Sequence, residues 1–336
     1  MFNCFKRTSL LALAVIGATS FAANAEYVGM GGAYGRTAAV NSFMNQTTRA
    51  ADGAVIRSSS DRDSEVWTSF SAHEGDMSDK GGWGKAEWDR DTLTIGYDFR
   101  TARFANSIQA DFSKGRFGST DAISKSKDVS IFGSSTMTDF VLPIDITMTA
   151  GIQAADVDTW RAVEVYDETA DEFSTAVVRG THDDWSAVIR TEVGLELSDE
   201  VRVFAALGGV YNNQGTVKET YVEGASVFAK SDGNFTSYME LGADYAFDVK
   251  GYDVKVGAAY QTLLRGRNLH YVAAYHDDLE DKFDARTPRL DKDRFQLKAQ
   301  VEKSLTDSVS VFGRVDAQFA SKNDILGGEV GVVIKI

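Results

Sequence analysis

The sequence contains very little cysteine, which can cross-link a chain through disulfides, and very little proline, which interrupts strands and helices. Its 336 residues include one cysteine, Cys4, and two prolines, Pro143 and Pro288, against 30 glycines and 11% aromatic residues. Proline removes a backbone donor from a β-ladder and glycine tolerates bends, so this balance favours long strands that curve. Aromatic residues in this number suit strands that present rings at membrane interfaces.

Long hydrophobic runs are also missing, apart from one near the N-terminus. There, Lys6 and Arg7 precede the apolar run 10–21, which is followed by a small-x-small cleavage site ending at Ala25. This order is typical of a secretory signal peptide, and the run is shorter than the roughly 20 residues of a helical membrane anchor. We therefore expect residues 1–25 to be removed during export. The single cysteine leaves with them, so the exported chain must hold together without disulfides.

A surplus of basic residues is absent as well. Lys and Arg number 35 against 49 Asp and Glu, which gives a formal net charge of −14 that moves to −16 when the two positive charges of the signal leave. Proteins that bind nucleic acid carry a basic footprint. We therefore expect no nucleic-acid partner.

From about residue 64 the hydrophobic residues recur at every second position, as in strands with two different faces. In 92–100, for example, Leu93, Ile95, Tyr97 and Phe99 alternate with polar residues or glycine. A tilted membrane strand needs about nine to eleven residues, and bacterial single-chain barrels have an even number of strands. We expect an all-β fold over 64–336, a twelve-stranded antiparallel transmembrane β-barrel. Its strands are expected near 65–77, 83–99, 104–118, 123–138, 141–157, 183–198, 201–215, 232–248, 252–265, 290–304, 307–321 and 325–336.

The connections between these strands indicate which end of the barrel is which. Those after even-numbered strands are short, such as 100–103 and 199–200, whereas most after odd-numbered strands are longer, such as 158–182, 216–231 and 266–289. Outer-membrane barrels place short turns on the periplasmic side and long loops outside. The sequence thus predicts a location in the bacterial outer membrane, with outer-membrane lipid and lipopolysaccharide as its surroundings.

One face of each strand would meet lipid, and the other would line a lumen that accepts charge. The candidate lumen charges are Arg190, Glu192, Glu196, Arg202, Glu240, Asp244, Lys255, Arg314 and Asp316. Because both signs occur among them, pairing within the lumen would plug and stiffen the barrel. A selective ion path is the alternative.

Residues 33–52 lack the two-fold period and contain no proline. Their alanine, methionine, glutamine and arginine residues favour a helix, and Asp52-Gly53 is typical of a helix stop. We expect a short N-terminal segment, 26–63, that contains this helix and precedes the barrel.

The last eight residues follow a polar-x-Gly-x-x-apolar-x-apolar pattern that ends at the C-terminus itself, with Glu329, Gly331, Ile334 and Ile336 at the defining positions. A free terminal strand can add to another sheet edge through its backbone groups. The pattern is similar to the signal that outer-membrane proteins present to the barrel-assembly machinery, which we expect as a partner.

The arrangement as a whole resembles the translocator domain of autotransporters (type V secretion). The resemblance covers about 33–336 and rests on residues 66–70 (VWTSF), 96–100 (GYDFR), 193–199 (VGLELSD) and 257–260 (GAAY), followed by the terminal strand. It implies a helix threaded through the lumen that joins the barrel to an exported passenger. Upstream of the helix only 26–32 remain, so we expect a structural or plugged-pore barrel without a sizeable passenger. A small-solute porin-like channel and a surface adhesin or cation-binding barrel are the alternatives.

Two of the expected loops carry the same tripeptide, with His182, Asp183 and Asp184 in one and His276, Asp277 and Asp278 in the other. A His/carboxylate pair can activate water, and carboxylate clusters bind divalent cations. Solvated acidic loop bases are the plainer interpretation. No nucleophile elbow, zinc-binding helix motif or phosphate-binding loop occurs, so we expect no enzyme and no cofactor, and divalent cations are the only ligands suggested for these six residues.

Overall fold

The structure is a computed structural model that describes residues 39–51, 64–78, 85–101, 103–119, 122–141, 143–167, 172–222, 226–230, 233–267, 269–286 and 289–336. The expected signal segment 1–25 lies outside the described residues. So do residues 33–38 and 52 of the expected helix.

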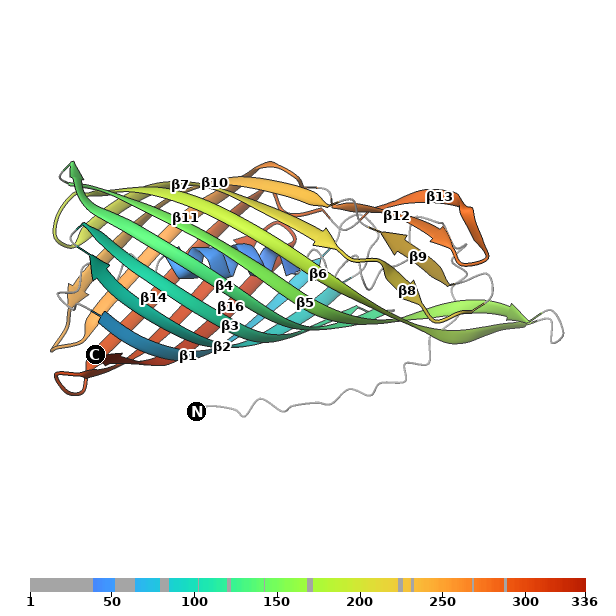
Figure 1. The fold of residues 1–336 in the computed structure, drawn as a ribbon, viewed down its shortest axis with the longest axis horizontal. Coiled ribbons are helices and arrows are strands. Elements are labelled where there is room, and N and C mark those ends of the chain that lie inside the picture. Colours follow the sequence, from blue (N-terminus) through green and yellow to red (C-terminus); the bar gives the residue numbers. More distant parts are fainter. Residues whose placement is uncertain are drawn as a thin grey trace.

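Twelve strands close into one antiparallel barrel, as predicted (Figure 1). β1 (Ser64–Ser78) pairs with both β2 and the last strand, β16, and β6 pairs with β7, which completes the ring. A closed ladder satisfies backbone donors and acceptors within the protein, which is the condition for crossing lipid. The other barrel strands are β2 (Lys85–Thr101), β3 (Phe104–Ser119), β4 (Ala122–Val141), β5 (Ile144–Asp167), β6 (Glu172–Glu196), β7 (Val201–Gln214), β10 (Asn234–Asp248), β11 (Asp253–Arg265), β14 (Asp293–Ser304), β15 (Val309–Ala320) and β16 (Asn323–Lys335).

Four shorter strands continue the sheet beyond one end of the barrel. They are β8 (Val217–Glu219), β9 (Val227–Lys230), β12 (His270–Tyr275) and β13 (Asp278–Arg286), and they follow β6 in that order. Figure 1 shows them, with the tips of β5 and β6, at the end opposite the C-terminus. We call these four strands, together with the tips that β5 and β6 form within 158–182, the extension.

The extension corrects the prediction that 158–182, 216–231 and 266–289 are loops. Most of the first range belongs to β5 and β6, and each of the other two holds two short strands. Val163 and Val178 are buried in the hairpin of β5 and β6. Continuing the ladder also satisfies backbone groups that a long loop would leave to water. The connection after β3 is shorter than predicted too, since only 120–121 separate β3 from β4.

The two faces of each barrel strand differ in the sense expected for a membrane wall. On β3, Phe112 is 47% exposed whereas its neighbour Asp111 is 2% exposed. Apolar side chains are also exposed on the adjacent strands, as Leu93 of β2 and Val129 of β4 show. Apolar side chains outside and polar side chains inside are the pattern of a barrel wall that faces lipid. We call the exposed apolar side chains of the barrel strands the outer band.

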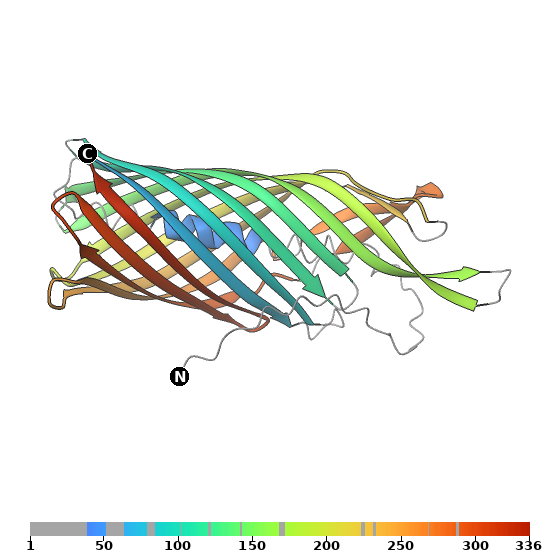
Figure 2. The same ribbon diagram turned by 90° about the horizontal axis from the view of Figure 1, so that it is seen from below.

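A helix occupies the interior of the barrel. Residues 39–51 are helical, and both views show this segment surrounded by the strands (Figures 1 and 2). All its residues but 39 and 49 are buried. The described helical residues form no helix that is both long enough and apolar enough to cross a membrane.

Candidate functional site

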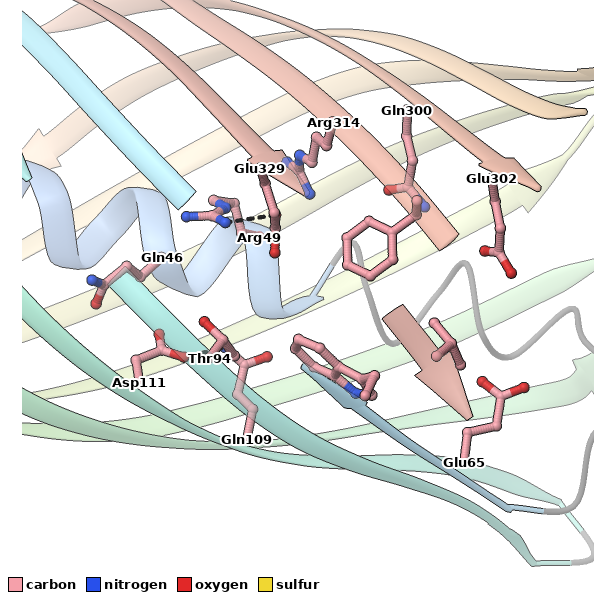
Figure 3. A pocket seen from close by; sticks show the side chains of 13 residues that line it. Gln46, Arg49, Glu65, Thr94, Gln109, Asp111, Gln300, Glu302, Arg314 and Glu329 are labelled. Carbon is pink, nitrogen blue, oxygen red and sulfur yellow. Dashed lines mark hydrogen bonds and ion pairs between the residues drawn. The ribbon is translucent and has the colours of Figure 1, made fainter. Parts of the chain in front are cut away.

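The helix is fastened to the strand that ends the chain through Arg49. Its guanidinium donates to the Glu329 carboxylate over 2.6 Å (Figure 3). It also donates to the Ser71 hydroxyl over 3.2 Å. Ser69 also donates to Glu329 over 2.6 Å. Charge-assisted hydrogen bonds of this length are stronger than neutral ones. Arg49 therefore ties the helix to β16 and β1, the two strands that close the barrel.

Three further polar residues of the helix contact other parts of the wall. The side-chain amide oxygen of Asn41 accepts from Arg294 of β14, and that of Asn45 accepts from Gln318 of β15 over 2.8 Å. The side-chain amide of Gln46 is oriented with its oxygen toward Arg90 of β2, and this oxygen accepts a hydrogen bond from the Arg90 guanidinium over 2.8 Å. Each contact joins a buried amide to a buried wall side chain. Together these contacts fix the rotation of the helix about its own axis and its depth along the lumen.

The apolar side chains of the helix pack against a small core inside the lumen. Val40, Phe43 and Met44 are spaced so that they share one helix face, and each is at most 1% exposed. The Phe43 ring lies 5.5 Å from the Phe132 ring of β4, centroid to centroid. The remaining members of this core are Ala50, Val188, Val210, Tyr238, Leu263, Leu269 and Leu290.

Charged side chains of the wall pair with one another around the helix. Arg190 lies 2.6 Å from Glu192 and 3.0 Å from Glu240, and Arg202 lies 2.7 Å from Glu192 and 2.6 Å from Asp145. A buried charge is tolerated only when it is paired and hydrogen-bonded. Charge of both signs is therefore compensated within this part of the lumen.

The other charged residues expected in the lumen are ion-paired or buried there, with the exception of Glu196. Asp244 lies 3.0 Å from Lys298 and 3.4 Å from Lys255, and Asp316 and Arg314 are both buried. Glu196 is the exception, because it is exposed as the last residue of β6, beside the turn to β7. Because Glu196 stands opposite the inward-facing Arg202 in the register, the expectation that it lines the lumen stays a prediction.

Two small cavities lie at opposite ends of the helix, each of about 50 Å³. The first is lined by Gln46 and Arg49 together with Glu65 at the start of β1 (Figure 3). The second is lined by Ala39 and Ser42, with residues from the half of the barrel nearer the extension. The helix therefore runs from the extension end toward the short-turn end.

The structure separates the two His-Asp-Asp tripeptides. His182 and Asp184 point inward from β6, with 3.4 Å between imidazole and carboxylate, whereas Asp183 points outward. The prediction that His182 lies in a loop is wrong, because β6 starts ten residues before it, at Glu172. His276 lies in the turn between β12 and β13, with its ring 5.3 Å from that of Tyr221.

The second tripeptide ends at the start of β13, since Asp277 completes the turn and Asp278 is the first residue of that strand. Among the residues that the structure describes, no group of three or more His, Cys, Asp or Glu side chains is arranged to hold a metal ion. The suggestion of cation binding at these positions stays a prediction.

The terminal strand presents its apolar residues outward. Val330, Val332, Ile334 and Ile336 are 64%, 37%, 49% and 73% exposed. Gly331 stands opposite Ser69 of β1 in the register. The sequence pattern selected Glu329 as part of an assembly signal, but it gave no hint that this carboxylate receives Arg49. The only available signal for the helix contacts was the spacing of Asn41, Asn45 and Arg49 along one side of the helix.

The chain was compared with known families, proteins and structures. The profile of the family described as the autotransporter β-domain matches residues 66–316. None of the curated protein sequences compared with the chain matches it.

Solved structures of autotransporter barrels are similar to this fold. The translocator domain of the autotransporter NalP from Neisseria meningitidis superposes with a TM-score of 0.73 at 14% identity, over 90% of this chain and 99% of that one. The transport unit of AIDA-I from Escherichia coli gives 0.55 at 14% identity, over 86% and 98%. The β-domain of the Bordetella autotransporter BrkA gives 0.52 at 12%, over 81% and 99%. Identities this low show a shared fold alone.

The family profile covers about three quarters of the chain and spans eleven of the twelve barrel strands in whole or large part. The closed barrel and the helix in its lumen agree with it. The chain belongs to the autotransporter β-domain family of the bacterial outer membrane.

Proposed function

We propose that the barrel is a translocator-type pore that rests closed, with the helix at 39–51 as its plug. The observation that carries this proposal is the attachment of the helix to an arc of neighbouring strands from β14 to β2, through Asn41, Gln46 and Arg49. A helix held at one point could swing aside as the lumen fluctuates. Four polar attachments, on β14, β15, β16 and β2, oppose such a movement.

The space left beside the helix supports the same proposal. Each of the two cavities can hold only a few water molecules, and the two share no lining residue. A hydrated solute would have to displace the helix or break wall ion pairs such as Arg190–Glu240. Because breaking a buried pair leaves an uncompensated charge, the closed state is expected to persist.

The proposal includes the route to the membrane. Residues 1–25 would be cleaved near Ala25, and β16 would be offered to the barrel-assembly machinery as a free edge. In the finished barrel that edge pairs with β1 from Lys335 to Asn323. The proposal assigns the barrel no catalytic step.

Single-channel conductance in planar bilayers tests the closed state. The exported chain from residue 26 is compared with a chain that starts at residue 61, so that only the helix-bearing segment differs. We expect little or no steady current through the first and a steady current at least tenfold larger through the second. A chain with Arg179→Gln, an exposed change in the extension, serves as the matched control and should match the full chain. A large steady current through the full chain would contradict the plug and favour a small-solute channel.

A surface-binding role is the second candidate, favoured by exposed apolar side chains on the hairpin of β5 and β6. Phe173 is 70% exposed and Val177 is 66% exposed, and apolar side chains gathered outside a barrel often mark interaction sites. Replacing 162–177 by a short turn should abolish adhesion of cells that carry the barrel while leaving its assembly intact. Unchanged adhesion would remove this candidate.

A further inference from the structure

Four cations lie together on the outer wall of β3 and β4, toward the end that carries the extension. Lys114 and Arg116 of β3 stand directly opposite Lys127 and Lys125 of β4 in the strand register. All four side chains are exposed and belong to the outward-facing set of their strands. We call these four residues the cationic square.

Carboxylates flank the cationic square on both sides. Opposite its members in the register stand Asp91 and Asp89 of β2 and Asp156 and Asp158 of β5. Each of the two rows across the four strands thus has the order acid, base, base, acid. Arg116 attracts the carboxylate of Asp89. Within the described part of the chain no side chain of the square comes within 4.0 Å of a carboxylate oxygen, and Asp158 pairs instead with Arg179 over 3.1 Å.

Like charges directly opposite on antiparallel strands repel, whereas opposite charges attract. In the observed order each cation of the square has a carboxylate opposite it on one side and a second cation opposite it on the other. The same eight residues in alternating order would have put no two cations opposite each other. The observed grouping leaves positive charge concentrated across one strand pair, where an anion from outside the chain can neutralise it.

The cationic square begins where the outer band ends. Phe112 and Val129 stand opposite each other and are 47% and 45% exposed, and Lys114 and Lys127 come two residues further toward the extension. Lys125 also lies 5.2 Å from the centre of the Trp160 ring. An amphipathic ring beside cations at the limit of an apolar wall is typical of the height of lipid headgroups.

We propose that the cationic square binds the phosphate groups of a lipopolysaccharide-type lipid in the outer leaflet, whose acyl chains lie along Phe112 and Val129. Lysine and arginine are the residues that bind phosphate, and arginine can do so with two parallel hydrogen bonds. The flanking carboxylates confine the positive charge to one strand pair, so the site fits a compact phosphorylated headgroup and repels an extended polyanion. This site is independent of whether the lumen is closed.

An exchange of charges tests the proposal without changing net charge. The variant Asp91→Lys, Lys114→Asp, Asp89→Arg, Arg116→Asp makes both rows alternate. The exported chain in detergent micelles is titrated with diphosphoryl lipid A, and bound lipid is counted by native mass spectrometry. Folding is checked by heat-modifiable migration on gels. We expect at least tenfold weaker lipid binding by the folded variant, and binding equal to the unaltered chain would overturn the proposal.

If the exchange variant does not fold, a second pair of variants and a comparison of two lipids still test the proposal. Neutralising the square by Lys114→Gln, Arg116→Gln, Lys125→Gln and Lys127→Gln should weaken lipid A binding at least tenfold. The matched control neutralises four exposed cations at the short-turn end, by Arg100→Gln, Arg103→Gln, Lys250→Gln and Lys335→Gln, and should leave binding within twofold. Equal losses in the two variants would contradict the site.

The comparison of two lipids uses the unaltered chain. Lipid A without phosphates should bind at least tenfold more weakly than the diphosphoryl form. Equal binding of the two would mean that the acyl chains alone are recognised, which overturns the proposal. Displacement of lipid A by millimolar inorganic phosphate would also overturn it, because the site would then be a simple anion site rather than a lipid site.

Discussion

Charges on the inner and the outer face of this wall are arranged in opposite ways. Inside, Arg190 and Arg202 share the carboxylate of Glu192 at 2.6 and 2.7 Å. Outside, Lys114 and Lys127 stand opposite each other, and their carboxylate neighbours lie only on the far side of each. A charge in the lumen must be neutralised by the protein itself, whereas a charge at the membrane surface can be neutralised by lipid headgroups. The inner charges are thus paired within the chain, whereas the cationic square is where we propose that lipid supplies part of the counter-charge.

Removing a shared inner carboxylate should have the largest effect. Glu192→Ala takes the shared carboxylate from both Arg190 and Arg202, so we expect a loss of about 3–5 kcal/mol in the free energy of unfolding, the usual range for a broken buried pair. Urea unfolding in detergent measures it. The control is Glu196→Ala at the exposed end of the same strand, where the change should stay within about 0.5 kcal/mol. Equal effects would contradict a special role for the inner pairs.

The same contrast applies to apolar residues. Phe43→Ala on the helix should lower stability by about 3 kcal/mol, because it opens a cavity beside Phe132 inside the lumen. Phe112→Ala on the outer face should have a smaller effect, since detergent or lipid fills the space. The shift in the midpoint of heat-modifiable gel migration reports both. If the outer substitution is the more damaging, the helix does not form a packed core with the wall.

The attachment of the helix to the terminal strand should matter less for stability than for closure. Arg49→Ala removes the 2.6 Å contact with Glu329 and should cost about 2 kcal/mol, since both side chains retain slight exposure and a charged hydrogen bond contributes roughly 1.5–3 kcal/mol. We expect brief channel openings in planar bilayers that the unaltered chain does not show. Asn45→Ala, which removes one neutral hydrogen bond, is the comparison and should give fewer openings. No difference between the two variants would show that Arg49 is not the main attachment.

The smallest effect is expected on the outer face. Lys127→Gln removes both the repulsion from Lys114 and the attraction of Asp156, which stands opposite it on β5. Stability in detergent without added lipid should therefore stay within about 0.5 kcal/mol, the size of cross-strand charge effects. Urea unfolding without lipid measures this. A clear loss of stability would mean that Lys127 already has a counter-charge within the protein.

The barrel itself could be predicted from the sequence because its physical cause is local. Leu93, Ile95 and Tyr97 alternate with polar residues, and alternation alone fixes which side of a strand meets lipid. The hairpin of β5 and β6 was missed beyond residue 157 because polar residues occur on both faces there, as in a solvated ribbon. His182 was consequently expected in a loop and lies on a strand instead.

The contacts of the helix could not be predicted for a different reason. Arg49 meets Glu329 and Asn45 meets Gln318, partners 280 and 273 residues away in the chain. The sequence shows that these side chains are polar and that the helix is amphipathic. Which wall residue each one meets depends on how deep the helix sits in the closed barrel, and no local pattern encodes that depth.

The position of the helix inside the lumen can be measured directly in intact outer membranes. The exported chain has no cysteine of its own, so Asn45→Cys with Gln318→Cys places a unique thiol pair at positions whose native side chains are 2.8 Å apart. A short bifunctional thiol reagent should cross-link this pair and change its migration on gels. Asn45→Cys paired with outward-facing Leu326→Cys should give no cross-link. Absence of the first cross-link in correctly folded barrels, or equal cross-linking of both pairs, would contradict a helix seated in the lumen.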